Sequence, residues 1–142
     1  MADVPITKMV IASRLSEVPA VQQAILDEVK CHGYGQDTLF AVRLALEEAL
    51  SNAIRHGNGE DPTKKVTIEY AVTDQRIEVS IADEGHGFQP DTLPDPTDDE
   101  NLARPHGRGV MLMQAYMNEI SYNDRGNRVT MVRTREAEDS AT

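Results

Sequence analysis

The stretch LALEEALSNAIRHGNG, residues 44–59, decides how the rest of the chain is interpreted. Its apolar residues recur at the spacing of an amphipathic helix, yet polar side chains crowd onto it. Glu48, Asn52 and His56 are each four residues apart, so on a helix they share one stripe that rises about 6 Å per step. The stretch is either a solvated helix face or one wall of a binding site, and its neighbours must decide.

The segments on either side of this stretch predict a simple order of elements. The helix is expected to begin with Asp37 or Thr38 as its N-cap, to run to about His56 and to end at Gly57 and Gly59. A strand over residues 6–12 and a helix over residues 18–34 precede it, and the Gly33 and Gly35 pair ends that earlier helix. Alternating stretches at residues 66–72 and 76–83, and again at 119–124 and 127–134, predict two antiparallel hairpins, with a helix over about residues 109–117 between them. This order predicts an α+β fold, a two-layer sandwich in which the helices pack on one face of a mixed, mostly antiparallel sheet.

Length and composition favour one globular domain over residues 1–142, with a frayed tail at about residues 136–142. Residues 89–106 hold four prolines and five acids without periodicity, which is typical of a mobile loop, and loops of this kind are often lids. Acidic residues outnumber basic ones by 24 to 14, so a net charge of −10 argues against direct binding of nucleic acid. The first residues, MADVPITKMV, show no basic segment followed by an apolar run, and no apolar stretch is long enough to cross a membrane. The lone Cys31 permits no intrachain disulfide, so we expect a cytoplasmic protein.

Two of the Gly-x-Gly pairs have surroundings that suggest binding. DEGHGF, residues 83–88, places Asp83 at the end of an inward-facing apolar row, where a fixed carboxylate suits an amino group such as that of adenine. Gly85 and Gly87 would leave room for a planar ring, although a plain turn explains this segment equally well. In HGRGVMLM, residues 106–113, Gly107 and Gly109 precede a helix start that could hold phosphates, with Arg104 and Arg108 close by. A glycine at a helix start is also common without any ligand.

The opening helix offers a third set of candidate groups. Asn52 has a hard oxygen suited to magnesium, and Glu48 could order or deprotonate a nucleophile. Solvation explains Glu47, and a favourable interaction with the helix dipole explains His56. Neither glycine pair matches a Rossmann turn, and the chain has no P-loop, so a nucleotide would have to bind in another way.

These three motifs, EALSN, DEGHG and GRG, stand in a fixed order that resembles the N, G1 and G2 boxes of the GHKL (Bergerat-fold) ATP-binding domains. With SNAIRHGN after the glutamate, the chain is similar to the bacterial anti-sigma factor serine/threonine kinases. The resemblance implies a protein-serine kinase that binds ATP and Mg²⁺, phosphorylates a small anti-anti-sigma partner of the STAS type, sequesters a sigma factor, and forms a homodimer. It implies Asn52 as the magnesium ligand, Glu48 as the catalytic base and Asp83 as the reader of adenine beside Gly85 and Gly87. Gly107 and Gly109 would line the phosphates under a lid at about residues 89–106, with Arg104 or Arg108 on the terminal phosphate.

Other functions are compatible with the same residues. The chain could be an ATP-sensing module that captures a partner without phosphorylating it, or a nucleotide-free interaction domain whose acidic loop docks a basic partner. A calcium site in DPTDDEN, residues 95–101, lacks the glycine and glutamate spacing of an EF-hand.

Overall fold

The fold is given by a computed structural model that describes residues 6–85, 116–124 and 126–136. In these ranges the elements are β1 (Thr7–Ala12), the 3-10 turn η1 (Leu15–Glu17), α1 (Val18–Cys31), α2 (Gln36–Asn52), the π-helical turn η2 (Ala53–Gly57), β2 (Lys65–Val72), β3 (Arg76–Ala82), β4 (Glu119–Tyr122) and β5 (Arg128–Thr134). Both hairpins, the first strand and the first two helices are therefore confirmed. The helix predicted over about residues 109–117 lies almost wholly outside the described residues.

The strands form one sheet in the order β1-β2-β3-β5-β4, and each neighbouring pair of these strands is antiparallel. Ile81 of β3 lies opposite Ile68 of β2 on one side and opposite Val129 of β5 on the other. Since successive side chains of a strand point to opposite faces, this register gathers the apolar rows of the strands on a single face.

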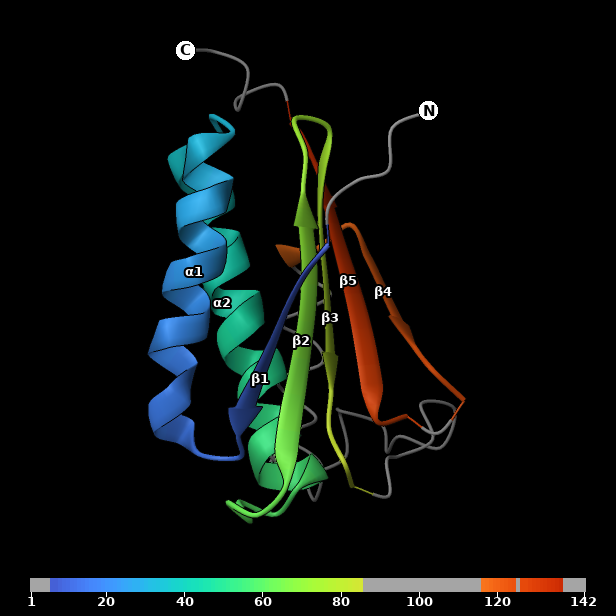
Figure 1. Cartoon of the computed structure of the whole chain (residues 1–142). Helices are drawn as coiled ribbons and strands as arrows, with labels where there is room; N and C mark the ends of the chain where they lie inside the picture. The colour runs from blue at the N-terminus through green and yellow to red at the C-terminus, as the bar shows by residue number, and fades with distance from the viewer. Residues whose placement is uncertain (1–5, 86–115, 125, 137–142) are drawn as a thin grey trace, which may run out of the picture.

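Both helices cover that apolar face, and they lie side by side against it (Figure 1). The largest fully buried side chains come from the two helices, η2 and the three central strands: Val21, Ile25, Val29, Val42, Leu46, Leu50, Ile54, Ile68, Ile77, Ile81 and Met131. Each such side chain contributes roughly 1.5–3 kcal/mol relative to an exposed one, so this interface is the main source of stability. No helix in the described part of the chain is both long enough and apolar enough to span a membrane.

The predicted N-cap of the second helix is wrong. Gly35, with extended backbone (φ −80°, ψ 176°), is the N-cap, and α2 begins at Gln36, before Asp37 and Thr38. Thr38 is fully buried, and its hydroxyl accepts a hydrogen bond from Nε of Arg133 at 3.3 Å, so it serves the packing of β5 against α2. The end of the preceding helix is as predicted, because Gly33 adopts the left-handed φ of +79° directly after its C-cap.

The chain direction brings the end of α2 and the end of β3 to the same end of the molecule, at the bottom of Figure 1. The loop between α1 and α2 and the turn between β2 and β3 lie at the opposite end. Two of the three motifs singled out in the sequence therefore meet at one end of the sandwich.

Candidate functional site

The last turns of α2 sort their polar side chains by exposure. Glu48 and Asn52 are partly buried, whereas Glu47, Arg55 and His56 are exposed, as expected for surface residues. Partial burial raises the pKa of Glu48; the negative charge of Glu47 raises it further, and the positive charge of Arg55 opposes both effects. A carboxylate with a raised pKa is a stronger base than an ordinary glutamate, which suits a residue that takes a proton in catalysis.

Asn52 has a carboxamide that is available for a ligand. Among the described residues its side chain makes no hydrogen bond, although it is partly buried at the last α-helical position of α2. In the same part of the chain no group of three or more His, Cys, Asp or Glu side chains could hold a metal ion. A cation bound here would therefore depend on Asn52 together with oxygens from a ligand and from water, an arrangement that Mg²⁺ accepts readily.

The second helix was predicted to run to about His56, but its α-helical part ends at Asn52. From Ala53 to Gly57 the chain continues as the wider π-helical turn η2. The N–H of Asn58 donates to the carbonyl of Ala53 at 2.9 Å, a separation of five residues instead of four. Single π turns occur frequently at functional sites, since they change the direction of the chain without ending the helix. Here the turn ends at Gly57, which contacts the end of β3.

Asp83 lies directly after β3, at the end of the buried row Ile77, Val79 and Ile81. Burial raises the pKa of its carboxyl group, while the N–H of Gly85 and the positive charge of Lys64 act in the opposite direction. Its Oδ1 accepts a hydrogen bond from Gly85 N–H at 2.8 Å. Within the described residues Oδ2 has no hydrogen-bond partner, so this oxygen can accept one from a ligand.

Gly57 and Gly85 are required by close packing around that carboxylate. A Cβ atom on Gly57 would lie 2.3 Å from Cγ and Oδ2 of Asp83, and a Cβ atom on Gly85 would lie 1.8 Å from the carbonyl oxygen of Gly57. Real Cβ atoms do not approach other atoms this closely. The absence of both side chains therefore lets the end of α2 and the DEG segment meet.

Asn58 is a site residue that the sequence did not single out. It is 3% exposed, and its Oδ1 accepts from Glu84 N–H at 2.8 Å while its Nδ2 donates to the carbonyl of Lys65 at 3.0 Å. The carboxylate of Glu84 in turn accepts from Lys65 N–H. In the sequence it stood inside the Gly57–Gly59 pair, which was interpreted as a helix stop, and at the end of SNAIRHGN, where it was given no role of its own.

The structure thus brings Asp83 and Gly85 together at the end of the helix that carries Glu48 and Asn52. The remaining predicted site residues, Gly87, Arg104, Gly107, Arg108 and Gly109, lie outside the described residues, as does the lid predicted at about residues 89–106.

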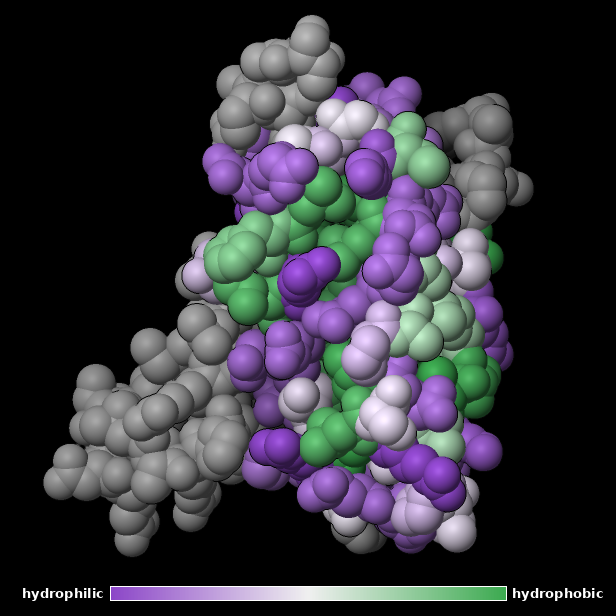
Figure 2. All heavy atoms as spheres, turned by 90° about the vertical axis from the view of Figure 1, so that its left-hand side faces the viewer, coloured by the Kyte–Doolittle hydropathy of each residue, from purple (hydrophilic) through white to green (hydrophobic). Residues whose placement is uncertain are grey.

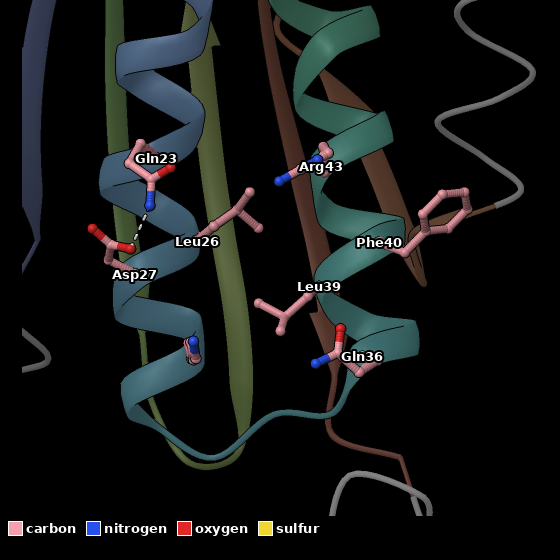
Figure 3. Close-up of a pocket in the computed structure, with 8 residues that line it drawn as sticks. Gln23, Leu26, Asp27, Gln36, Leu39, Phe40 and Arg43 are labelled. Carbon is pink, nitrogen blue, oxygen red and sulfur yellow. Dashed lines mark hydrogen bonds between the residues drawn. The ribbon is translucent and has the colours of Figure 1, made fainter.

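A separate groove lies between the two helices, away from this site. It has a volume of about 340 Å³ and is lined by Gln23, Leu26, Asp27 and Lys30 of α1 and by Gln36, Leu39, Phe40 and Arg43 of α2 (Figure 3). On the helical face apolar side chains gather in this region among polar ones (Figure 2). The groove lies toward the loop between α1 and α2, at the opposite end of the helices from Gly57. None of its lining residues belongs to the three motifs.

A family model described as a histidine kinase-like ATPase domain matches residues 11–133. The chain therefore belongs to this family of ATPase domains, in agreement with the α+β fold and with the motifs at the end of α2 and β3.

Comparison with curated proteins identifies the group within that family. The serine-protein kinase RsbW of Bacillus licheniformis is 30% identical over 119 residues, which is 78% of this chain and 74% of that kinase. RsbW of Bacillus subtilis (strain 168) is 34% identical over 94 residues, which is 62% of this chain but only 59% of that kinase. RsbW of Listeria monocytogenes EGD-e is 25% identical over 108 residues. Within the family, the chain groups with the RsbW serine-protein kinases.

A solved structure agrees with the fold. The crystal structure of the RsbU and RsbW domains of a Mycobacterium tuberculosis protein superposes with a TM-score of 0.63 at 15% sequence identity. The match covers 95% of this chain and 33% of that one. At this identity the likeness supports the architecture alone.

Proposed function

We propose that this chain is an ATP-dependent protein-serine kinase that acts as an anti-sigma-factor switch by phosphorylating a small anti-anti-sigma protein of the STAS type. The observation that carries the proposal is the contact between Gly57, at the end of the helix bearing Glu48 and Asn52, and the carboxylate of Asp83. This contact places the partly buried carboxylate of Asp83, which can accept a hydrogen bond from a purine amine, beside the helix that carries two other groups. These are Glu48, a candidate catalytic base, and Asn52, whose side-chain oxygen suits Mg²⁺. The grouping of the chain with the RsbW serine-protein kinases supports the same function.

Each described residue then has a role that its surroundings allow. Asp83 accepts a hydrogen bond from the exocyclic amine of adenine through Oδ2, because Oδ1 is already engaged by Gly85. Asn52 would hold Mg²⁺, and the cation would neutralise charge on the phosphates. Glu48 takes the proton from the serine hydroxyl of the partner as the serine oxygen bonds to the γ-phosphorus. The bond from that phosphorus to the bridging oxygen breaks, and ADP leaves.

Phosphate contacts from Gly107 and Gly109, a terminal-phosphate contact from Arg104 or Arg108, and a ring contact from Gly87 complete the proposed site. These roles rest on the motif DEGHG and on the segment ARPHGRG, residues 103–109. Capture of a sigma factor while the partner is phosphorylated, and assembly as a homodimer, belong to the same proposal.

The test is incubation of the protein with ATP, Mg²⁺ and a STAS-type protein from the same genome, followed by mass spectrometry of the partner. A single phosphoserine on the partner is expected. If titration calorimetry shows ATP binding but no phosphoserine forms, the chain is an ATP-sensing module and the kinase proposal is wrong. If ATP gives no heat across a broad concentration range, the nucleotide site itself is wrong and a nucleotide-free interaction domain is favoured.

A further inference from the structure

The carboxylate of Asp83 does not hold its position by its own hydrogen bond alone. Its Oδ2 lies where a side chain on Gly57 would be, since a Cβ atom there would be 2.3 Å away. Gly57 is not among the glycines with a left-handed backbone, which are Gly33, Gly59 and Gly126 in the described part of the chain. Space, and not backbone conformation, therefore demands a glycine at position 57.

The next residue fixes the same junction through hydrogen bonds. Asn58 is buried, and its carboxamide uses its oxygen on the N–H of Glu84, the residue after Asp83, and its nitrogen on the carbonyl of Lys65 at the start of β2. Its own N–H closes the π turn on Ala53. One residue, through its backbone and its side chain, thus joins the end of the helix, the start of β2 and the segment that carries the carboxylate.

We infer that Gly57 and Asn58 are positioning residues for purine selectivity, which hold the Asp83 carboxylate where it meets the exocyclic amine of adenine. The inference rests on the proposed ATP site and deepens it. A carboxylate only accepts hydrogen bonds, so it favours the amine of adenine and disfavours the carbonyl that guanine carries at that position. The strength of this preference depends on where the carboxylate lies, because a displaced acceptor is hydrated and no longer distinguishes the two groups.

The discriminating experiment compares two nucleotides that differ only in the recognised group. ATP and purine riboside triphosphate, which lacks the amine, are titrated with Mg²⁺ into the full chain. The parent is expected to bind ATP about 10–100-fold more tightly, the range for a hydrogen bond to a charged, partly buried acceptor. In Asn58→Ala and Gly57→Ala the ATP affinity should fall about tenfold while the affinity for purine riboside triphosphate stays near the parent value, so the ratio of the two affinities should fall about tenfold.

Gly59→Ala is the matched control. Gly59 has a φ of +62° and no atom within 4 Å of an added Cβ, so the substitution strains the backbone without touching Asp83. It should lower Tm and leave the ratio of the two affinities unchanged. If Gly57 and Asn58 only stabilised the fold, their substitution would reduce the affinities for ATP and for purine riboside triphosphate equally. A fall in the ratio of the two affinities would therefore exclude a purely structural role.

The possible outcomes distinguish a failure of the proposed ATP site from a failure of the positioning role of Gly57 and Asn58. If the parent binds neither nucleotide, the proposed function fails. If the parent prefers ATP and both variants, folded at the temperature of the titration, keep the parent ratio, the positioning role is wrong while the ATP site stands. Asn58→Ala retains the glycine, so it still tests the inference if Gly57→Ala does not fold.

Discussion

Replacing Glu48 by glutamine should separate catalysis from nucleotide binding. The substitution keeps the shape of a partly buried side chain and removes its ability to take a proton. Positioned general bases contribute about 10²–10⁴-fold, so kcat for serine phosphorylation should fall by that factor, equivalent to about 3–5 kcal/mol in the barrier. The dissociation constant for ATP should stay within about threefold of the parent value, because Glu48 acts on the serine hydroxyl of the partner protein and not on the adenine ring.

The same variant should also be slightly more stable than the parent at neutral pH. The pKa of Glu48 is raised in the folded state, chiefly by burial and then by Glu47, so the unfolded chain releases this proton at lower pH than the folded one. Stability is therefore lost as the pH rises through this window, and glutamine avoids the loss. Partial exposure and the opposing charge of Arg55 keep the gain below about 1 kcal/mol, or at most about 4 °C in Tm, and the two proteins should converge below about pH 4.

Glu47→Gln is the control, since Glu47 is the adjacent acid on the same helix and is exposed. Rates are measured as phosphoserine formed on the STAS-type partner, ATP affinity by calorimetry, and Tm between pH 4 and 8 by circular dichroism. The assignment of the base is refuted if Glu48→Gln keeps its rate within about tenfold of the parent, or if Glu47→Gln loses as much activity as Glu48→Gln.

Four further substitutions test the fold. Leu50→Ala removes a fully buried side chain at the interface between helix and sheet, and urea unfolding should show a loss of about 2–5 kcal/mol; a loss below about 1 kcal/mol would contradict the packing. Gly33→Ala places a side chain at a φ of +79° and should cost about 1–2 kcal/mol, whereas Gly35→Ser, at an extended N-cap, should cost nothing measurable. Glu69→Gln removes the ion pair with Arg128, which lowers the pKa of Glu69, so Tm should fall at pH 7. The ion pair stabilises the fold above the ordinary glutamate pKa of 4.5, and this stabilisation is lost as the pH falls through the lowered pKa of Glu69. The difference in Tm between the parent and Glu69→Gln should therefore disappear in acid and become smaller in 1 M NaCl. A difference in Tm that does not change with pH would be inconsistent with the ion pair.

Periodicity alone predicted most of the described fold. The alternation in residues 66–72 and 76–83 predicted two strands of an antiparallel hairpin and their inward-facing rows, and the helical spacing predicted the buried faces of α1 and α2. The register, in which Ile68 lies opposite Ile81, came from the structure. It succeeded because burial of one face imposes these periods on any amphipathic element. The start of α2 was mispredicted because Thr38, a good N-cap residue in isolation, is committed to Arg133, which is distant in the sequence.

The candidate site was predictable only where a motif carried it. Glu48, Asn52, Asp83 and Gly85 were found from their order along the chain. The π turn was not, because its Asn58-to-Ala53 hydrogen bond spans five residues and departs from the helical period that was used for the prediction. The role of Asn58 was not either, because its side chain accepts from Glu84, which lies after β3 and is distant in the sequence. A buried asparagine that joins two distant segments leaves no periodic signal in either of them.

The order of β3, β5 and β4 in the sheet has a consequence for how freely the chain can vary in length. Ala82 ends β3 opposite Arg128 of β5, and the chain next enters the sheet as β4, which begins at Glu119 on the far side of β5. Residues 83–118 therefore connect two strands that are not neighbours in the sheet. The entropy of closing such a connection grows with the logarithm of its length, and doubling it costs only about 0.6 kcal/mol. Insertions and deletions well inside this connection should therefore affect the folding equilibrium far less than changes within the strands. Changes in the length of this connection could therefore alter which partner is bound, or how fast it is phosphorylated, while the sandwich stays folded.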